Sequence, residues 1–153
     1  MMHPKKPNFF SKKPSSTPRN KFRADKRGSW QIAGNLNASF FYAAKGISYS
    51  FKSQRNFRIH VFMGSFVFGI GFWLKLPMNE FAVLVITVSS VLVLELINTS
   101  IEAVVDLSIG RRFHPLARIA KDCSAGAVLI AAIGSLLIAC YLLLPKLLVQ
   151  LGM

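Results

Sequence analysis

The sequence has few acidic residues, since six of its 153 residues are Asp or Glu against 19 Lys and Arg. It contains no Gly-x4-Gly-Lys-Ser/Thr phosphate loop and no Gly-x-Gly-x-x-Gly motif. It also has no His/Cys cluster with zinc-site spacing, and no Ser-His-Asp set can be assembled from it. Its two cysteines, Cys123 and Cys140, lie 17 residues apart on one expected helix, too far for a disulfide, so we interpret both as small apolar packing residues. These absences exclude the common phosphate-loop, dinucleotide, zinc and serine-nucleophile sites.

What the sequence does contain is apolar surface: 52% of its residues are hydrophobic and the mean hydropathy is +0.43, which predicts a membrane protein. Three segments, about 59–76, 81–105 and 123–144, approach the roughly 20 residues that a membrane helix needs. The first is the weakest, because its charge-free part is short enough for a buried helix of a soluble protein. The fold class expected is an all-α membrane protein with three transmembrane helices.

The basic residues are distributed unevenly. Thirteen of the 19 precede Ile59, and four more lie between the second and third segments. The positive-inside rule then predicts a multi-pass protein of the cell inner (plasma) membrane with a cytoplasmic N-terminus. We therefore interpret the charge as an orientation signal and a contact with anionic membrane lipids, and expect no nucleic acid partner.

The chain divides by composition into a tail and a membrane domain. Residues 1–34 are rich in Pro, Lys and Arg and predict a disordered basic cytoplasmic tail. Residues 35–147 form the expected membrane domain, and 148–153 the C-terminal end. Within 35–54, apolar residues recur at helical spacing beside lysines, which predicts an amphipathic helix on the membrane surface. A helix packed on a soluble domain would show the same pattern, but the chain offers little soluble structure for such packing.

Four polar residues interrupt the second apolar segment at helical spacing: Glu95, Asn98, Glu102 and Asp106. At about 100° per residue they fall within roughly 80° of one another on one face of a helix. A carboxylate near the centre of a membrane costs about 2.5 kcal/mol or more, so such residues usually mark function. Neighbouring carboxylates also repel, so the stripe should recruit a divalent ion or a Lys/Arg of another segment. The alternative is a helix end that leaves the membrane with solvated charges.

The acidic stripe is followed by a loop rich in Arg and Lys over 110–122. Carboxylates that hold a divalent ion, with cations opposite them, are the groups needed to position a nucleotide polyphosphate. An acid deeper in the membrane could then act on a lipid hydroxyl. The alternative from another class is a non-enzymatic membrane subunit or ion-conducting oligomer in which the acids line a polar path.

The polar stripe has the spacing Glu95-x-x-Asn98-x-x-x-Glu102-x-x-x-Asp106. It is preceded by Asn56-Phe57-Arg58-Ile59-His60 and followed by His114 and Lys121-Asp122. This combined pattern resembles the small prokaryotic diacylglycerol kinase and undecaprenol kinase family over about residues 35–145. The resemblance implies a homotrimeric integral-membrane lipid kinase, with three spans and a surface helix per chain, that takes ATP and Mg²⁺ from the cytoplasm. It implies conversion of diacylglycerol to phosphatidic acid in phospholipid metabolism and lipid recycling, or of undecaprenol to undecaprenyl phosphate.

Carried over by position, the resemblance makes Glu95 the general base and Asn98 its companion. It assigns nucleotide contacts to Tyr42, Gln54, Glu102, Arg112, Phe113, His114, Lys121 and Asp122. It assigns the lipid site to Ser48, Phe51, Glu95 and Ala125.

The chain departs from many relatives at one expected metal ligand. Glu102 matches a metal-binding carboxylate, but the second such position is Gln54, a neutral amide that offers an oxygen without charge. We therefore expect weaker metal binding, or another ligand in that role, for which Asp106 is the candidate.

Overall fold

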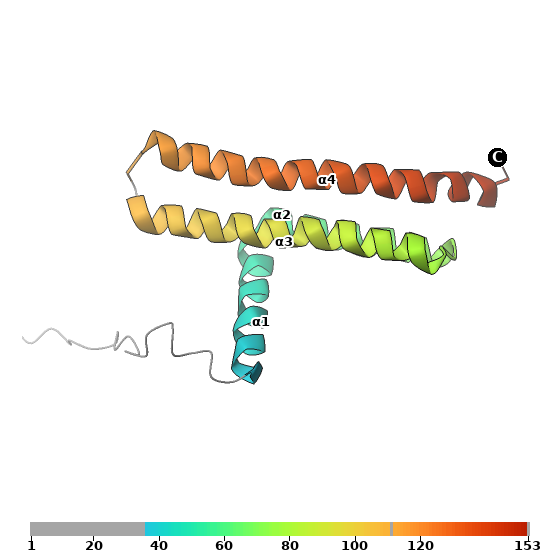
Figure 1. Ribbon diagram of the computed structural model, residues 1–153, viewed down its shortest axis with the longest axis horizontal. Coiled ribbons are helices and arrows are strands. Elements are labelled where there is room, and N and C mark those ends of the chain that lie inside the picture. Colours follow the sequence, from blue (N-terminus) through green and yellow to red (C-terminus); the bar gives the residue numbers. More distant parts are fainter. Residues whose placement is uncertain (1–35, 111, 153) are drawn as a thin grey trace, which may run out of the picture. The chain divides into compact units, whose positions relative to one another are not determined.

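The computed structural model describes residues 36–110 and 112–152. These residues form four helices and no strand: α1 Leu36–Ser53, α2 Arg55–Trp73, α3 Met78–Ile109 and α4 Pro115–Gln150 (Figure 1). The prediction of an all-helical chain is confirmed. The expected tail, 1–34, lies outside the described residues. Phe40–Met153 is one compact unit, and the other unit, Met1–Ser39, contributes only the first residues of α1 to the described part.

Extended residues precede α2 and α3, a glycine ends α3, and a proline begins α4. Gln54, expected inside the first helix, instead has extended dihedral angles (φ −101°, ψ 117°) and precedes α2. Pro77 precedes α3 in an extended conformation. Gly110 ends α3 at φ +59°, a value that glycine adopts without strain. Pro115 occupies the first turn of α4, where no amide proton is needed.

Two of the described helices, α3 and α4, are long and apolar enough to cross a membrane. Only 17% of the most apolar window of each is buried within the chain, whereas the core helix of a soluble protein would be mostly buried. Large side chains such as Ile130 and Tyr141 are 74% and 80% exposed. Cys123 and Cys140 are free and exposed, so neither belongs to the buried core of the single chain. α2, with 19 residues, is not one of these two helices, so the first of the three expected spans stays a prediction.

α3 is the central helix of the compact unit and contacts both α2 and α4. Figure 1 shows α3 and α4 running side by side in opposite directions. α2 approaches α3 closely at Gly64, where an added Cβ would lie 2.6 Å from Val88 Cγ1. Close contact through small residues is typical of membrane helices.

A buried apolar cluster lies at the end of the unit where α2 joins α3. Leu84, Ala139 and Leu143 form the buried core there. The rings of Phe72 and Phe81 have centroids 4.7 Å apart. The half-buried pair Lys146 Nζ and Glu80 Oε2, 2.6 Å apart, joins the last part of α4 to the first turn of α3. This end holds the three helices together, and the polar residues gather toward the other end.

Candidate functional site

The acidic stripe of α3 faces the other helices. Glu95 and Asn98 are 2% and 7% exposed, whereas Glu102 is half-buried and the side chain of Asp106 is 59% exposed. Burial therefore decreases along the stripe toward the end of α3. A solvated helix end would not bury Glu95, so that alternative does not describe this residue.

Glu95 lies in a small cavity of about 130 Å³ between α2, α3 and α4. Four polar side chains line this cavity: Asn56, His60, Glu95 and Asn98. Ala125 lines the same cavity. Glu95 and Ala125, both expected in the lipid site, therefore lie at one cavity. Within the described part of the chain, no hydrogen bond to a Glu95 carboxylate oxygen is formed. The carboxylate is thus buried, faces a polar cavity and keeps its acceptor capacity.

Asn56 and His60 belong to the polar segment before the first expected span, which was expected to anchor at the membrane interface and to contribute to the site, but neither residue was given a role of its own. Their spacing of four residues places both on one face of α2. Polar residues on one face of an otherwise apolar helix were the signal that could have identified them. The structure shows that this face lines the cavity of Glu95.

A chain of hydrogen bonds connects three of the expected site residues. Gln54 Nε2 donates to Glu102 Oε2 over 3.3 Å, and Asn98 Nδ2 donates to Glu102 Oε1 over 3.3 Å. Ser124 Oγ donates to Asn98 Oδ1 over 2.6 Å. Ser124 was not foreseen from the sequence. These hydrogen bonds link the residue before α2 to α3, and α3 to α4.

The pair Gln54 and Glu102 is the part of the site that fits a divalent ion. No group of three or more His, Cys, Asp or Glu side chains that could hold a metal occurs in residues 36–110 and 112–152. Mg²⁺ needs only one or two protein oxygens when phosphates and waters complete its shell, and a carboxylate beside an amide supplies these. Asp106, the other candidate ligand, instead accepts a hydrogen bond from Lys121 Nζ at 2.5 Å.

A second cavity, of about 290 Å³, lies where α3 ends and α4 begins. It is lined by five of the expected nucleotide residues, Arg112, Phe113, His114, Lys121 and Asp122. The structure therefore brings these residues together.

Two of the residues that line this second cavity are held by local contacts. His114 Nδ1 accepts the Leu116 amide at 3.2 Å and caps α4. Asp122 pairs with Arg118 one turn away, at 3.6 Å. By contrast, Tyr42 is half-exposed on α1 beside Lys45 and lines none of these cavities.

The expected lipid-site residues fall into two groups. Ser48 and Phe51 line a groove of about 630 Å³ formed by α1, α2 and α3. Glu95 and Ala125 line the small cavity on the other side of α3. A single chain therefore does not bring these four residues together.

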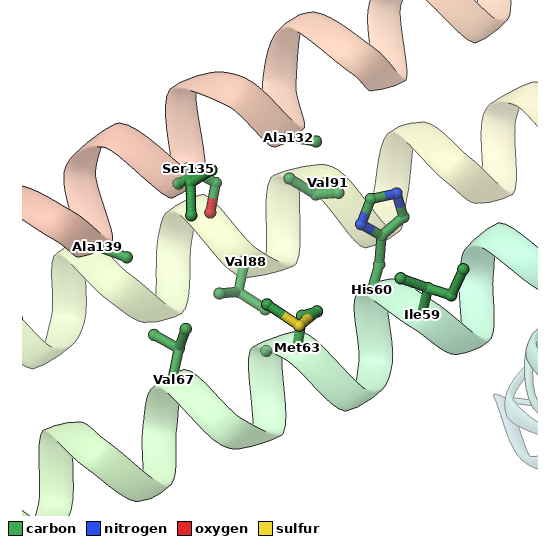
Figure 2. A pocket seen from close by; sticks show the side chains of 11 residues that line it. Ile59, His60, Met63, Val67, Val88, Val91, Ala132, Ser135 and Ala139 are labelled. Atoms are coloured by element: carbon green, nitrogen blue, oxygen red, sulfur yellow. The ribbon is translucent and has the colours of Figure 1, made fainter.

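An apolar cavity of about 220 Å³ continues from the Glu95 cavity, and the two share His60 and Ala132. Figure 2 shows His60, Met63 and Val67 projecting from α2 toward Val88 and Val91 of α3. His60 thus lies at the boundary between a polar and an apolar space.

The family model for prokaryotic diacylglycerol kinase matches residues 41–143. A diacylglycerol kinase of Synechocystis sp. is 51% identical over 123 residues, which cover 80% of this chain and 70% of that protein. An undecaprenol kinase of Bacillus subtilis is 39% identical over 71% of this chain and 88% of that protein. A diacylglycerol kinase of Escherichia coli K12 is 34% identical over 67% of this chain and 83% of that protein. The chain therefore belongs to the prokaryotic diacylglycerol kinase family and is a lipid kinase.

Proposed function

We propose that this kinase transfers the γ-phosphate of ATP, in the presence of Mg²⁺, to the free hydroxyl of diacylglycerol and so makes phosphatidic acid for phospholipid metabolism and lipid recycling. The observation that carries this proposal is Glu95, a carboxylate 2% exposed in the middle of an apolar helix and facing a polar cavity. A buried acid destabilises such a helix, so acids at such positions usually mark a functional site. The relative named diacylglycerol kinase at 51% identity supports the choice of substrate.

The chemistry assigned to Glu95 is general base catalysis. The lipid hydroxyl oxygen attacks the γ-phosphorus while its proton passes to the Glu95 carboxylate. The bond from the γ-phosphorus to the bridging oxygen breaks, and ADP leaves with that electron pair. Asn98 lines the same cavity, where it is placed to hold the hydroxyl.

The phosphate donor is assigned to the end of the site where α3 ends and α4 begins. Glu102 and Gln54 would hold Mg²⁺, with Asp106 as a further ligand if Lys121 releases it. When bound, Mg²⁺ supplies charge neutralisation at the β- and γ-phosphates. Arg112, Phe113, His114, Lys121 and Asp122 would contact the nucleotide from the second cavity, of about 290 Å³. Tyr42 does not line this cavity, and its contact with the nucleotide is proposed from the family resemblance.

We further propose that the protein works as a homotrimer with shared sites. Ser48 and Phe51 line a different space from the cavity of Glu95 and Ala125, which supports a site completed by a neighbouring copy. The exposed apolar faces of α3 and α4 leave room for other copies and for lipid. In this arrangement α2, α3 and α4 span the inner (plasma) membrane with the N-terminus in the cytoplasm. Native mass spectrometry of the detergent-solubilised protein tests the number of copies.

Undecaprenol is the second candidate substrate. The relative named undecaprenol kinase is 39% identical and matches this chain over 88% of its own length. Transfer to undecaprenol would use the same atoms of the site and yield undecaprenyl phosphate. A non-enzymatic role is not favoured, since the relatives are kinases.

The test is a parallel assay of both alcohols with one preparation. Purified full-length protein in mixed micelles is given ATP labelled at the γ-phosphate, with and without Mg²⁺. We expect Mg²⁺-dependent label in phosphatidic acid, at a higher kcat/KM than label in undecaprenyl phosphate. A reversed preference selects the second candidate, and the absence of label from both lipids would refute the proposed reaction.

A further inference from the structure

Ser124 is a buried serine on α4 that faces the acidic stripe of α3. Its hydroxyl lies 2.6 Å from Asn98 Oδ1. A second acceptor, the carbonyl oxygen of Lys121 in the same helix, lies 2.9 Å away. A serine hydroxyl has a single proton to donate. The contact to Asn98 is the shorter of the two and the one that joins two helices.

The contacts of Asn98 with Ser124 and Glu102 together fix the way its amide faces. With Oδ1 turned toward Ser124, the amide nitrogen points to Glu102 and donates to Oε1 over 3.3 Å. The reversed amide would place its oxygen against a carboxylate oxygen, and neither atom carries a proton. Since amide orientation follows from the hydrogen-bond network, Glu102 sets the orientation in which Asn98 donates to it, and the bond from Ser124 holds the amide there.

Glu102 is held by two amides, one on each oxygen. Asn98 donates to Oε1 and Gln54 to Oε2, both over 3.3 Å. This distance is slightly beyond the usual N–H···O range, so neither amide alone holds the carboxylate firmly. Of the two, Asn98 is itself held from another helix, by Ser124. Loss of that hydroxyl should therefore leave the carboxylate free to turn.

We propose that Ser124 is a positioning residue that, through Asn98, keeps the Glu102 carboxylate in the orientation that receives the metal-bound nucleotide. The inference rests on the proposed function, because it takes Glu102 as the metal-binding carboxylate. Loss of a group that orients a metal ligand usually costs 10- to 100-fold in metal affinity. Ser124 acts through one neutral intermediary, so we expect a loss of about tenfold.

The first experiment compares the full-length protein with Ser124→Ala, Ser124→Thr and Ser100→Ala in mixed micelles. Ser100 is the matched control, because its exposed hydroxyl bonds to the Leu96 carbonyl of its own helix, at 2.9 Å. Mn²⁺ binding is titrated by electron paramagnetic resonance in the presence of a non-hydrolysable ATP analogue. We expect Ser124→Ala to bind Mn²⁺ about tenfold more weakly. Ser124→Thr, which keeps the hydroxyl, should bind within about threefold of the original protein, and Ser100→Ala should not differ from it.

The kinetic readout separates positioning from a general loss of structure. In Ser124→Ala the Mg²⁺ concentration for half-maximal rate should rise about tenfold, a larger change than that in the KM for the lipid alcohol. If Ser124→Ala does not fold, Ser124→Cys, a similar side chain with a weaker donor, should show a smaller shift in the same direction.

A double-mutant cycle tests whether the effect passes through Asn98. On an Asn98→Ala background, adding Ser124→Ala should change Mn²⁺ affinity by less than about twofold. A full tenfold loss on that background would overturn the inference, as would unchanged metal affinity in the single variant. These results differ from failure of the proposed function, in which the original protein would itself show neither Mn²⁺-nucleotide binding nor lipid phosphorylation.

Discussion

Replacing Gln54 with Glu would place a second negative charge directly beside Glu102. Gln54 Nε2 lies 3.3 Å from Glu102 Oε2, and Glu has nearly the same size and shape as Gln. Two unit charges at that separation repel by about 1 kcal/mol in bulk water and about 5 kcal/mol at an effective dielectric constant of 20. Both side chains are half-buried, so we expect a repulsion between these limits.

A divalent cation bound between the two carboxylates would remove this repulsion. The relief of the repulsion therefore adds to the free energy of metal binding. Every 1.4 kcal/mol is a factor of ten in a binding constant. We therefore expect Gln54→Glu to lower the apparent dissociation constant of Mg²⁺ by at least about tenfold. The metal-free variant should be less stable than the original protein, and saturating Mg²⁺ should restore its stability.

The assay measures initial rates of lipid phosphorylation against Mg²⁺ concentration, together with the unfolding midpoint in micelles with and without Mg²⁺. Ser53→Glu is the matched control, because it adds the same charge one residue earlier, at an exposed side chain whose hydroxyl bonds to the Tyr49 carbonyl. An unchanged or increased Mg²⁺ requirement in Gln54→Glu would refute the reasoning. An equal gain in Ser53→Glu would show that only the overall charge matters.

The other predictions concern the base, the metal carboxylate and the helix contact. Glu95→Gln should lower turnover by about 10²- to 10⁴-fold while a nucleotide titration stays nearly unchanged, and retained turnover would remove Glu95 from its role. Glu102→Ala should raise the Mg²⁺ concentration for half-maximal rate by about tenfold or more, and an unchanged nucleotide and metal titration would count against its assignment. Gly64→Ala should lower the free energy of unfolding by about 1–3 kcal/mol, because its Cβ would lie 2.6 Å from Val88 Cγ1. Adding Val88→Ala should recover part of this loss of stability. Gly69→Ala, with open space around the new Cβ, should cause no loss. The measurement is the unfolding midpoint of each variant in micelles.

The helical elements and the polar stripe could be predicted from the sequence because both are local. Apolar periodicity over 81–105 and 123–144 identified the central parts of α3 and α4, although both helices extend further. The turns of α3 and α4 outside these segments are less apolar, so the hydrophobic pattern did not include them. The shared face of Glu95, Asn98 and Glu102 follows from their spacing on one helix, and the burial of Glu95 agrees with it.

Other features of the site could not be predicted from spacing. The shared cavity of Asn56, His60 and Glu95 and the bond from Ser124 to Asn98 both join residues of different helices. The pairing of Asp106 with Lys121 likewise depends on how the end of α3 meets the start of α4.

The sequence by itself determined the kind of protein: its helices, its apolar faces, the acids on α3 and, through the motif, its family. Only the tertiary structure decided which side chains meet, namely that Gln54 and Asn98 hold Glu102, and that Ser48 and Phe51 lie apart from Glu95. The physical reason is that the period of a helix sets the direction of each side chain about its own axis. The partner that a side chain meets depends instead on how neighbouring helices pack, and close contacts such as Gly64 with Val88 set that packing.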